Sequence, residues 1–583
     1  MTMIHRTPLL ACAALACASA AGAGPTSGEP VTIMGIQGRG QFSPMAGRIV
    51  TTGGVVTLHT AKGSGFWIQD PDGDGDFATS DGVFVAARRG RPPVGAKVTV
   101  TGRVQELRFG DALPLTRLTR VREIRILARG QPLPAPIPVT AVPGEGIIEA
   151  IDFWEPLEGM RVSVTGGRVV SPTSRFGEFT LLAPGNARPG SGYFPDSGHL
   201  LLGYSDQGVD YNPERILVDD ASLPRGLILR PGDGVDHLVG VVDYRYGNYK
   251  IQPGRVQPRQ FGRRPEPPAP GAARGLTVAT FNVGGLFDRT DDPHKDDERS
   301  TPSVGALETK LSKLVLALEG PLGLPAILVV QEVENTEILR RLGDRVNARG
   351  DTAYRAVSVD SSDPRGIEVG LLWDADRAAL ERAFRLHGRA VEAAFGRRSA
   401  SPGREPLVGV FEIAGERLIV VGCHFKSKRG DDPLFGLRQP PVRGTEAQRK
   451  AQARAVREYV DEVLAAEPGA MVIVAGDLND FPFPEPGEGA DHPLAILEGA
   501  DGETPLTNLV RHVDPAGRYT FVFDGNSQVL DYLLVSPALR AHLQEANIVH
   551  FNAGYPHALA DDPATALRAS DHDAVAAHFD LGP

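Results

Sequence analysis

The stretch Val472-Ile-Val-Ala-Gly-Asp-Leu-Asn-Asp480 turns from apolar to polar within nine positions. Its apolar part, which begins at Met471, predicts a buried strand that ends at Gly476. Two acids and an amide follow at the mouth of the predicted core, where ionised carboxylates need a cation, a hydrogen-bond donor or water. A polar turn that caps the next element would explain the same residues, so this stretch alone leaves both interpretations open.

Other apolar runs in the same part of the chain also begin or end in polar side chains. From Gly275 onward, predicted strands and helices alternate, which indicates an α/β or α+β domain. So many polar groups at strand ends in one sheet domain indicate a single convergent pocket. The residues concerned are Asn282, Glu332, His424, Asp477, Asn479, Asp531, Asp571 and His572.

The chemistry that fits this set is metal-assisted hydrolysis of a phosphodiester. Glu332, with Asn282 and Asp571, offers hard oxygen ligands suited to Mg²⁺ or Mn²⁺. One histidine can activate water while the other contacts or protonates the leaving side, and Asp531 is the candidate partner that orients the base. The sequence has no paired Cys/His zinc spacing, no Gly-x-Ser-x-Gly elbow and no Walker-type phosphate loop, which removes several other enzyme classes.

Residues 275–583 resemble the endonuclease/exonuclease/phosphatase superfamily, which includes pancreatic deoxyribonuclease and exonuclease III. The closer wording resembles a secreted bacterial nuclease branch in which β-rich OB-like modules precede the catalytic domain. The segments that carry the resemblance, in the family's order, are Phe281-Asn282, Gln331-Glu-Val-Glu-Asn335, His424-Phe-Lys-Ser-Lys428, Gly476-Asp-Leu-Asn-Asp-Phe481, Asp524-Gly-Asn-Ser-Gln528, Leu530-Asp531 and Ser570-Asp-His572.

The resemblance implies a four-layer α/β/β/α sandwich and a role for each site residue. Glu332 would bind the metal, assisted by Asn282 and Asp571. Asp477 and Asn479 would orient the phosphate and the attacking water. His572 would be the base, oriented by Asp531, and His424 the acid or phosphate donor. Glu368 is a candidate acidic partner for His424, with a solvated strand-edge acid as the alternative. Tyr532 and Ala574 depart from the branch, which often has His and Pro there.

Bulk composition sets limits on domains, partners and export. A chain of 583 residues predicts two to four domains, and a net charge of −11 excludes a general basic coat for nucleic acid. Residues 1–23 read as a signal peptide, which predicts a periplasmic or extracellular protein; a lipoprotein signal ending at Cys12 or Cys17 is the alternative. The mature chain would keep only Cys423, interpreted as a core residue, and no later run is long enough to cross a membrane.

Two β-rich modules are expected before the catalytic domain. Short Gly-bounded strands predict an OB-like module at 24–130 and a second one at 131–262, with an insertion near 184–224. A Pro-rich linker covers 263–274, and the catalytic domain covers 275–583. An acidic stretch in the first module has calcium-loop offsets, although its flanks are strands, so a solvated acidic hairpin loop stays open. Its acids are Asp70, Asp72, Asp74, Asp76 and Asp81.

Basic residues form two candidate contact regions for a polyanion, and a solvated face is the alternative for each. In the second module, Tyr244, Tyr246 and Tyr249 are interleaved with Arg245, Lys250 and further basic residues. In the catalytic domain, Lys426, Lys428 and Arg429 follow His424 as candidate phosphate contacts, and a basic track continues from Arg438 to Arg457.

The sequence as a whole predicts an exported, Mg²⁺- or Mn²⁺-dependent nuclease that acts on DNA, with RNA as a second substrate left open. A phosphodiesterase of lipids or inositol phosphates, resembling a sphingomyelinase, is the alternative within the same fold. A non-enzymatic extracellular DNA-binding protein is the alternative from another class. No obligate protein partner is inferred.

Overall fold

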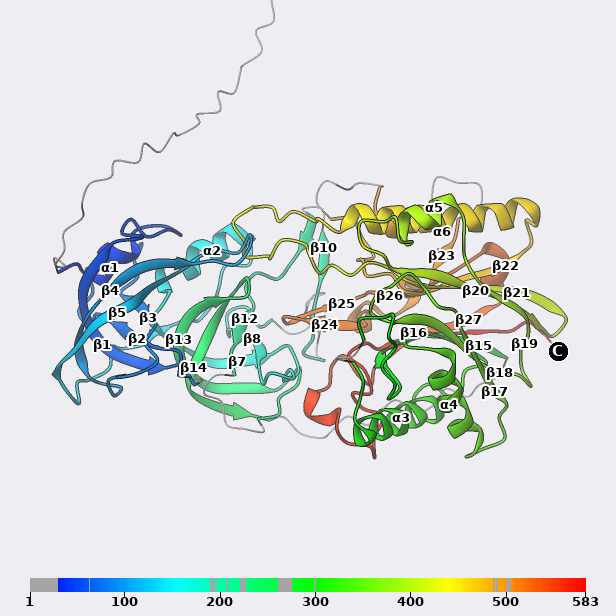
Figure 1. Cartoon of the computed structure of the whole chain (residues 1–583), viewed down its shortest axis with the longest axis horizontal. Helices are drawn as coiled ribbons and strands as arrows, with labels where there is room; N and C mark the ends of the chain where they lie inside the picture. The colour runs from blue at the N-terminus through cyan, green and yellow to red at the C-terminus, as the bar shows by residue number, and fades with distance from the viewer. Residues whose placement is uncertain are drawn as a thin grey trace, which may run out of the picture.

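The computed structural model describes residues 30–61, 63–188, 194–195, 197–205, 208–220, 227–260, 275–297, 300–485, 488, 491–499 and 505–582. The predicted signal peptide and Pro-rich linker lie outside these residues. Figure 1 shows two β-rich parts at one end of the molecule and a larger part with long helices at the other. No helix among the described residues combines the length and the apolar character needed to cross a membrane.

The first β-rich part is a closed barrel with the strand order β1-β2-β3-β5-β4. A one-turn helix, α1, precedes it; Thr32 caps this helix by accepting a hydrogen bond from Gly35 N at 3.1 Å. The barrel interior is a single apolar cluster that includes Phe66, Ile68 and Val98. The elements are α1 (Ile33–Gln37), β1 (Ile49–His59), β2 (Phe66–Gln69), β3 (Gly82–Val85), β4 (Lys97–Leu107) and β5 (Leu115–Ala128).

The second β-rich part repeats the strand order of the first. Its sheet has the strand order β13-β14-β12-β8-β7-β6. Because β13 also pairs with β7, five of these strands form a closed ring. In both parts the third and fifth strands of this ring are parallel, β3 with β5 and β12 with β14. The elements are β6 (Ile137–Pro138), α2 (Ile147–Trp154), η1 (Glu155–Leu157), β7 (Arg161–Val169), β8 (Phe179–Leu182), β12 (Ile216–Val218), β13 (Gly234–Arg245) and β14 (Asn248–Arg259).

The C-terminal part contains two six-stranded mixed sheets. The first has the order β17-β18-β16-β15-β28-β27 and the second the order β19-β20-β21-β22-β26-β23. The strands are β15 (Leu276–Leu286), β16 (Ile327–Val333), β17 (Tyr354–Ser358), β18 (Glu368–Asp374), β19 (Ala379–Arg385), β20 (Arg404–Ile413), β21 (Glu416–His424), β22 (Met471–Asp477), β23 (Thr507–Asn508), β26 (Asp531–Val535), β27 (Leu543–Val549) and β28 (Ala574–Phe579).

Apolar faces hold the sheets and helices of this part together. One core cluster joins residues of both sheets, such as Val329 and Val420, to the long helix α6. A second cluster joins the other face of the first sheet to α3 and α4, as Figure 1 also shows. The helices are α3 (Val304–Glu319), α4 (Thr336–Asn347), α5 (Arg389–Ala394), α6 (Glu446–Ala466), α7 (Pro493–Glu498), α8 (Pro537–Arg540), η2 (Leu509–His512), η3 (Pro515–Gly517) and η4 (His557–Leu559).

The segment between β8 and β12 of the second module reaches across to the C-terminal part. Its strand β9 pairs in parallel with β25, which forms a hairpin with β24. Arg215 Nε donates to Asp524 O at 2.8 Å, and Asn212 Nδ2 donates to Asn526 Oδ1 at 2.6 Å. The elements are β9 (Leu200–Leu201), β10 (Gly203–Ser205), β11 (Gly208–Asp210), β24 (Phe521–Phe523) and β25 (Asn526–Gln528).

Most of the aromatic residues expected to stack bases in the second module are buried. Tyr244 OH donates to Phe435 O at 2.5 Å, and Tyr249 OH donates to Glu155 Oε2 at 2.6 Å. Only Tyr246 of the three tyrosines is exposed. The neighbouring Lys250 is paired with Glu178. The prediction of a stacking platform there is therefore wrong for Tyr244 and Tyr249, because both rings belong to the module's core.

The acidic loop of the first module does not gather its carboxylates. Asp70 Oδ1 accepts from Asp72 N at 3.1 Å, Asp74 Oδ1 accepts from Asp76 N at 2.9 Å, and Asp76 is paired with Arg39. Burial, and then the charges of Asp74 and Asp70, raise the pKa of Asp81. No three of these five acids converge within metal-binding reach in the described part of the chain. The acids thus fold the loop on itself, as a solvated hairpin loop would.

Candidate active site

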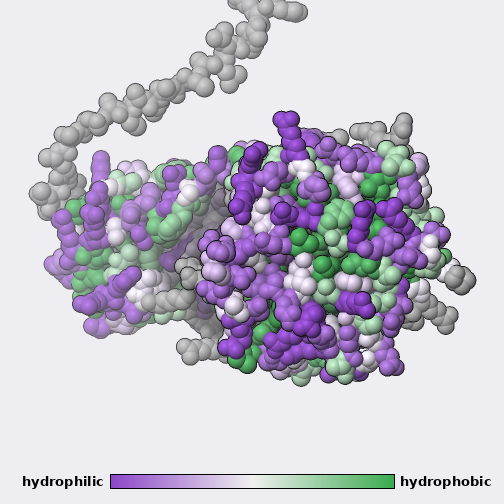
Figure 2. Space-filling view, turned by 45° about the vertical axis from the view of Figure 1, so that its right-hand side comes forward, coloured by the Kyte–Doolittle hydropathy of each residue, from purple (hydrophilic) through white to green (hydrophobic). Residues whose placement is uncertain are grey.

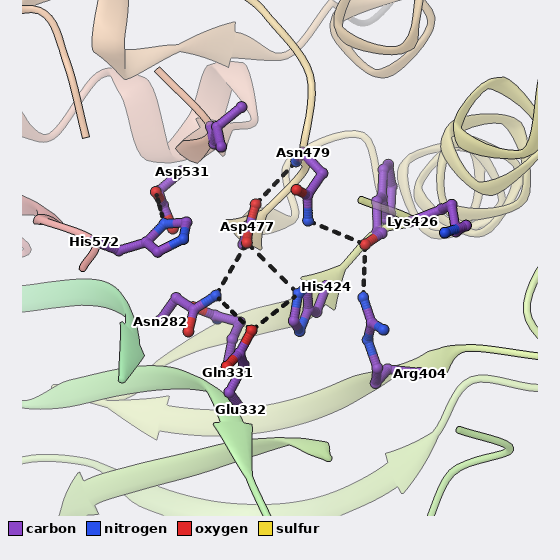
Figure 3. Close-up of polar contacts among 12 residues, drawn as sticks. Asn282, Gln331, Glu332, Arg404, His424, Lys426, Asp477, Asn479, Asp531 and His572 are labelled. Carbon is purple, nitrogen blue, oxygen red and sulfur yellow. Dashed lines mark hydrogen bonds and ion pairs between the residues drawn. The ribbon is translucent and has the colours of Figure 1, made fainter. Parts of the chain in front are cut away.

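The polar strand ends meet because the strands that carry them are neighbours. Asn282 on β15 is in register with Gln331 on β16, and these strands are parallel. On the other sheet His424 on β21 is in register with Asp477 on β22, again in parallel. Figure 3 shows the side chains from the two sheets pointing toward one another across one pocket. The convergence expected from the sequence is therefore present.

Asn282 and His424 link the carboxylates of the two sheets. Asn282 Nδ2 donates to Asp477 Oδ2 at 3.0 Å and to Glu332 Oε1 at 3.4 Å. His424 Nε2 lies 3.5 Å from Asp477 Oδ2 and 4.0 Å from Glu332 Oε1. These contacts appear as dashed lines in Figure 3. Four residues from four strands thus form one polar network.

His572 and Asp531 form a buried pair beside this network. His572 Nδ1 lies 2.8 Å from Asp531 Oδ2, and the Phe521 ring packs against the imidazole with centroids 4.6 Å apart. Burial by itself lowers the pKa of His572, but the charges of Asp531, Asp477 and Asp571 outweigh it and raise this pKa well above its usual value. Asp531 thereby fixes the orientation and the charge of the ring, as expected for a partner of a proton-transfer histidine.

The two histidines of the site are in different charge states. Burial, then the charges of Arg404, Arg365 and His572, lowers the pKa of His424 well below its usual value, so this imidazole is neutral at pH 7. Burial, followed by the charge of Asp531, raises the pKa of Asp477 to about 7. A protonated His572 and a neutral His424 on opposite sides of Asp477 suit two distinct proton-transfer roles.

The backbone is held in unusual conformations at two of the site residues. Glu332 has φ +61° and Asn479 has φ +51°, in the left-handed region that side-chain-bearing residues rarely adopt. A Cβ atom at Gly476 would overlap the carbonyl oxygen of Cys423, so only glycine allows β22 to lie this close to β21. Such conformations persist where the surrounding structure enforces them, and they concentrate at functional sites.

The donor set suits a hard divalent cation. One ligand atom each from Asp477, Asp531 and His572 lies within 4.8 Å of the others, and the buried Asp531 Oδ1 has no hydrogen-bond partner. Asp571, expected with Glu332 in the metal set, is exposed beside this group. Burial lowers the pKa of Lys310 to about 8, although the charges of Asp571 and Glu332 act in the opposite direction. Carboxylate and amide oxygens are the ligands that Mg²⁺ and Mn²⁺ prefer.

Two lysines on α3, the half-buried Lys310 and the buried Lys313, support the segment that carries Asp571 and His572, and neither was predicted from the sequence. Lys310 Nζ donates to the carbonyl oxygens of Val283 and Ala569. Lys313 Nζ donates to four carbonyl oxygens at 2.7–3.0 Å, those of Leu559, Asp562, Thr565 and Leu567. The available signal was a pair of lysines on an otherwise apolar helix face.

Arg404 was also missed, although it reaches the site from the start of β20. It donates to Asp363 Oδ2 at 2.8 Å and to Phe425 O at 2.6 Å, and the same carbonyl accepts from Asn479 Nδ2 at 3.2 Å. Arg404 stands at the start of a strand, whereas the predicted site residue His424 stands at the end of one. The two residues lie opposite each other because β20 is antiparallel to β21.

The structure corrects the expected partner of His424. Glu368 Oε1 lies 3.5 Å from Lys295 Nζ. The acids next to His424 are Asp477 and Glu332 instead, and no contact joins His424 to Glu368 among the described residues. Glu368 is buried at the start of β18 and pairs with Lys295, so the alternative of a solvated strand-edge acid is wrong as well.

The expected phosphate contacts are only partly available. Lys428 Nζ donates to Asp480 Oδ1 at 2.8 Å and Glu485 Oε2 at 3.1 Å, so it is engaged in ion pairs. Lys426 is half-buried close to the site, and Arg429 is exposed. The basic track beyond them is wrong as a phosphate path, because its members pair with acids. These pairs are Arg438–Asp432, Arg443–Glu485, Arg449–Asp480, Lys450–Glu446, Arg454–Asp491 and Arg457–Asp461.

One family model matches the part of the chain that carries most of this site. Residues 277–553 match the model of the endonuclease/exonuclease/phosphatase family. This part of the chain is similar to that family. The match covers every site residue except Asp571 and His572, which lie beyond its end. Residues 146–260 match a domain of unknown function. No curated protein matches the chain.

Several solved structures are similar to about half of this chain. An endonuclease/exonuclease/phosphatase from Bacteroides vulgatus is 15% identical over 53% of this chain and 100% of its own, with a TM-score of 0.34. TDP2 from Caenorhabditis elegans is 18% identical over 52% and 74%, with a TM-score of 0.35. An AP endonuclease from Archaeoglobus fulgidus is 17% identical over 52% and 100%, with a TM-score of 0.33.

Proposed function

We propose that the protein is an exported, divalent-metal-dependent nuclease that hydrolyses phosphodiester bonds of DNA. The match of residues 277–553 to the family model supports phosphodiester hydrolysis as the reaction class. The observation that carries the proposal is the meeting of the Asp531–His572 pair with the network of Asn282, Glu332, His424 and Asp477. The N-terminal 23 residues support export, to the periplasm or beyond the cell.

Each side chain has a proposed role. Glu332, with Asn282 and Asp571, holds Mg²⁺ or Mn²⁺, which supplies positive charge to stabilise the transition state. Asp477 and Asn479 orient the phosphate and the attacking water. His572, held by Asp531, takes the proton from that water in its neutral form, which the positive charge of a bound cation would favour over the protonated form. Neutral His424 donates a hydrogen bond to the phosphate or the leaving oxygen. Lys426 and Arg429 contact neighbouring phosphates; Lys428 does not, because acids already engage it.

The architecture belongs to the same proposal. Residues 275–583 form a four-layer α/β/β/α sandwich, and residues 24–130 and 131–262 form two OB-like modules joined to it by the 263–274 linker. The shared strand order of the two modules supports this assignment, since a five-stranded barrel is the frame of an OB-like fold. Figure 2 shows a mainly hydrophilic surface at the catalytic end with smaller hydrophobic groups between.

A substrate panel tests the function. We expect the chain without residues 1–23 to cleave plasmid and linear DNA with Mg²⁺ or Mn²⁺ and to lose this activity in excess EDTA, because the site is built from hard oxygen ligands. The measurement is the rate of fragment formation for double-stranded DNA, single-stranded DNA and RNA, with sphingomyelin tested in parallel. Cleavage that persists after full chelation contradicts the metal role. Release of phosphocholine from sphingomyelin, with DNA left intact, would show that the substrate is a lipid and not DNA.

A further inference from the structure

A second group of carboxylates lies close to the candidate active site in sequence but is separate from it. One ligand oxygen each from Asp292, Asp297 and Glu334 lies within 4.8 Å of the others. Asp292 and Asp297 belong to the loop that follows β15, whereas Glu334 comes directly after β16 and two residues after Glu332. The group therefore ties a long loop to the strand that supplies the proposed metal ligand.

Two of the three carboxylates are buried. Asp297 is 1% exposed and Glu334 5% exposed. Among the described residues, Asp297 Oδ1 has no hydrogen-bond partner, and the other oxygen of this carboxylate accepts one long bond, from Asp292 N at 3.4 Å. A buried carboxylate without donors loses its hydration without compensation, so a positive charge is needed at this point.

The lysine of the same loop does not provide that charge. Lys295 Nζ donates to the carbonyl oxygens of Ser361 and Asp363 at 3.1 and 3.2 Å, and it lies 2.7 Å from Asp360 Oδ1. It also pairs with Glu368. These contacts fill the donors of the ammonium group and direct it away from Asp297.

We propose that Asp292, Asp297 and Glu334 bind a hard divalent cation, with Ca²⁺ as the expected ion. Three carboxylates from a loop and a strand end form an irregular all-oxygen set, and Ca²⁺ accepts such sets with water completing its shell. A cavity of about 400 Å³ lined by Asp292 and Glu334, together with Lys295 and Asn335, gives the ion and its waters access to two of the three ligands, while Asp297 is not part of its lining. The loop is already docked beside it, since Asn335 Nδ2 donates to Asp288 Oδ2 at 3.1 Å.

The bound cation would hold the loop against a segment next to the active site. Asp296 N, beside Asp297, donates to Pro364 O at 2.6 Å. The next residue, Arg365, is exposed, and the charge of Glu332 acts on its guanidinium. This site is therefore structural and distinct from the proposed catalytic metal, which uses Glu332.

Calorimetric titration of the full chain with Ca²⁺ tests the site in a Glu332→Gln background, which removes the proposed catalytic ligand. We expect Asp292→Asn, added to this background, to weaken one binding event by at least about tenfold, since it deletes one of three anionic ligands. About 5 mM Ca²⁺ should raise the Tm of Glu332→Gln more than that of the double variant, because only the former binds the ion tightly. Asp292 is exposed, so its variant is expected to fold.

Asp74→Asn in the same background is the matched control, because Asp74 belongs to the acidic loop of the first module. It should leave this binding event unchanged. Equal Ca²⁺ affinity and equal Tm shifts with and without Asp292→Asn would overturn the proposal, as would the absence of any Ca²⁺ binding. Since the readouts are binding and stability, they do not depend on the protein being a nuclease.

A different observation carries a second inference, which rests on the proposed function: a β-module residue orients the catalytic pair. His199, in the segment between β8 and β12, is buried and lies 2.9 Å through Nε2 from Tyr519 OH and 3.0 Å through Nδ1 from Ser527 Oγ. Its ring stacks on Tyr519 with centroids 4.1 Å apart. His199 therefore fixes Tyr519 from across the domain boundary.

The segment that begins with Tyr519 touches both members of the catalytic pair. Thr520 Oγ1 accepts from Asp531 N at 3.3 Å, and Thr520 O accepts from Asp573 N at 2.7 Å. The next residue, Phe521, packs on the ring of His572. Tyr519 also stacks on His550, whose Nδ1 lies 2.9 Å from Asp573 Oδ2. We infer that His199 is a positioning residue for His572 and Asp531.

The test compares His199→Ala and His199→Gln with His237→Ala, a control in the same module. We expect His199→Ala to lower kcat for DNA by about tenfold or more with KM little changed, because a small misplacement of a catalytic group has effects of this size. His199→Gln, which can still bond to Tyr519, should recover part of the loss. An unchanged kcat in His199→Ala, or a loss that follows only from unfolding at the assay temperature, overturns the inference. An inactive wild-type protein would instead overturn the proposed function.

Discussion

His572→Ala is expected to lower kcat for DNA cleavage by about 10³-fold, the range lost when a general acid–base group is removed. The imidazole is 2.8 Å from Asp531, which makes it the one histidine of the site with a dedicated orienting carboxylate. KM should change little, because the buried His572 is expected to act in the transition state rather than to bind the ground-state substrate. The measurement is steady-state kinetics on linear DNA at saturating Mg²⁺.

His387→Ala is the matched control, because His387 is exposed after β19 and its hydrogen bond among the described residues is to Arg385 O, outside the site. It should keep wild-type kinetics. The kcat of Asp531→Asn should lie between the values of His572→Ala and His387→Ala. The amide can still contact the imidazole ring but no longer stabilises its positive charge. A His572→Ala enzyme that keeps activity within about threefold of wild type, well below the usual range of effects, removes His572 from the mechanism.

The pairing of His572 with Asp531 shows what kind of information a sequence carries. Asp531 begins β26 of one sheet, and His572 directly precedes β28 of the other. The two sheets share one core cluster, so polar residues at the ends of their apolar strands can meet between them. The resemblance then supplied the roles, and the short distance between the two side chains agrees with it. Residues whose position follows from a strand end were therefore within reach.

Residues whose role depends on long-range ion pairs could not be predicted from the sequence. Lys428 and the basic track up to Arg457 look like a phosphate path in sequence, where acids such as Asp480 and Glu485 are distant from several of them. In the fold these acids lie beside them and neutralise them. Local composition shows which charges exist, but not which of them pair, because the pairing depends on how α6 packs against the loop after β22.

The same limit applies between domains. The sequence predicted two modules and an insertion near 184–224, yet nothing local indicates that His199 contacts Tyr519, which lies 320 residues later. The hydrogen bonds of that interface use ordinary residue types such as Asn212 and Arg215. Buried lysines such as Lys313 are partly predictable from the sequence. A lysine on an apolar helix face indicates that hydrogen-bond acceptors must lie opposite, but not which carbonyl groups supply them.

Glu332→Gln is expected to lower kcat/KM by about 10²- to 10³-fold, because it removes the main anionic ligand of the proposed cation while keeping the side chain's size. Activity should also need a higher Mg²⁺ concentration to saturate. The measurement is initial rate against Mg²⁺ concentration, with Glu337→Gln as control; Glu337 is exposed on α4 and pairs only with Arg340 among the described residues. Saturation at the wild-type Mg²⁺ concentration with unchanged rate would exclude Glu332 as a ligand.

The stability of Glu332→Gln separates a functional from a structural role for this carboxylate. Glu332 lies beside Asp477, whose pKa its charge helps to raise, and it adopts a left-handed backbone conformation. Without a cation these features cost stability, because like charges repel and the conformation is unfavourable. The variant should therefore unfold at the same Tm as wild type or higher in EDTA, and lose the stabilisation that Mg²⁺ gives wild type. A lower Tm in EDTA would mean that Glu332 serves the fold rather than the cation.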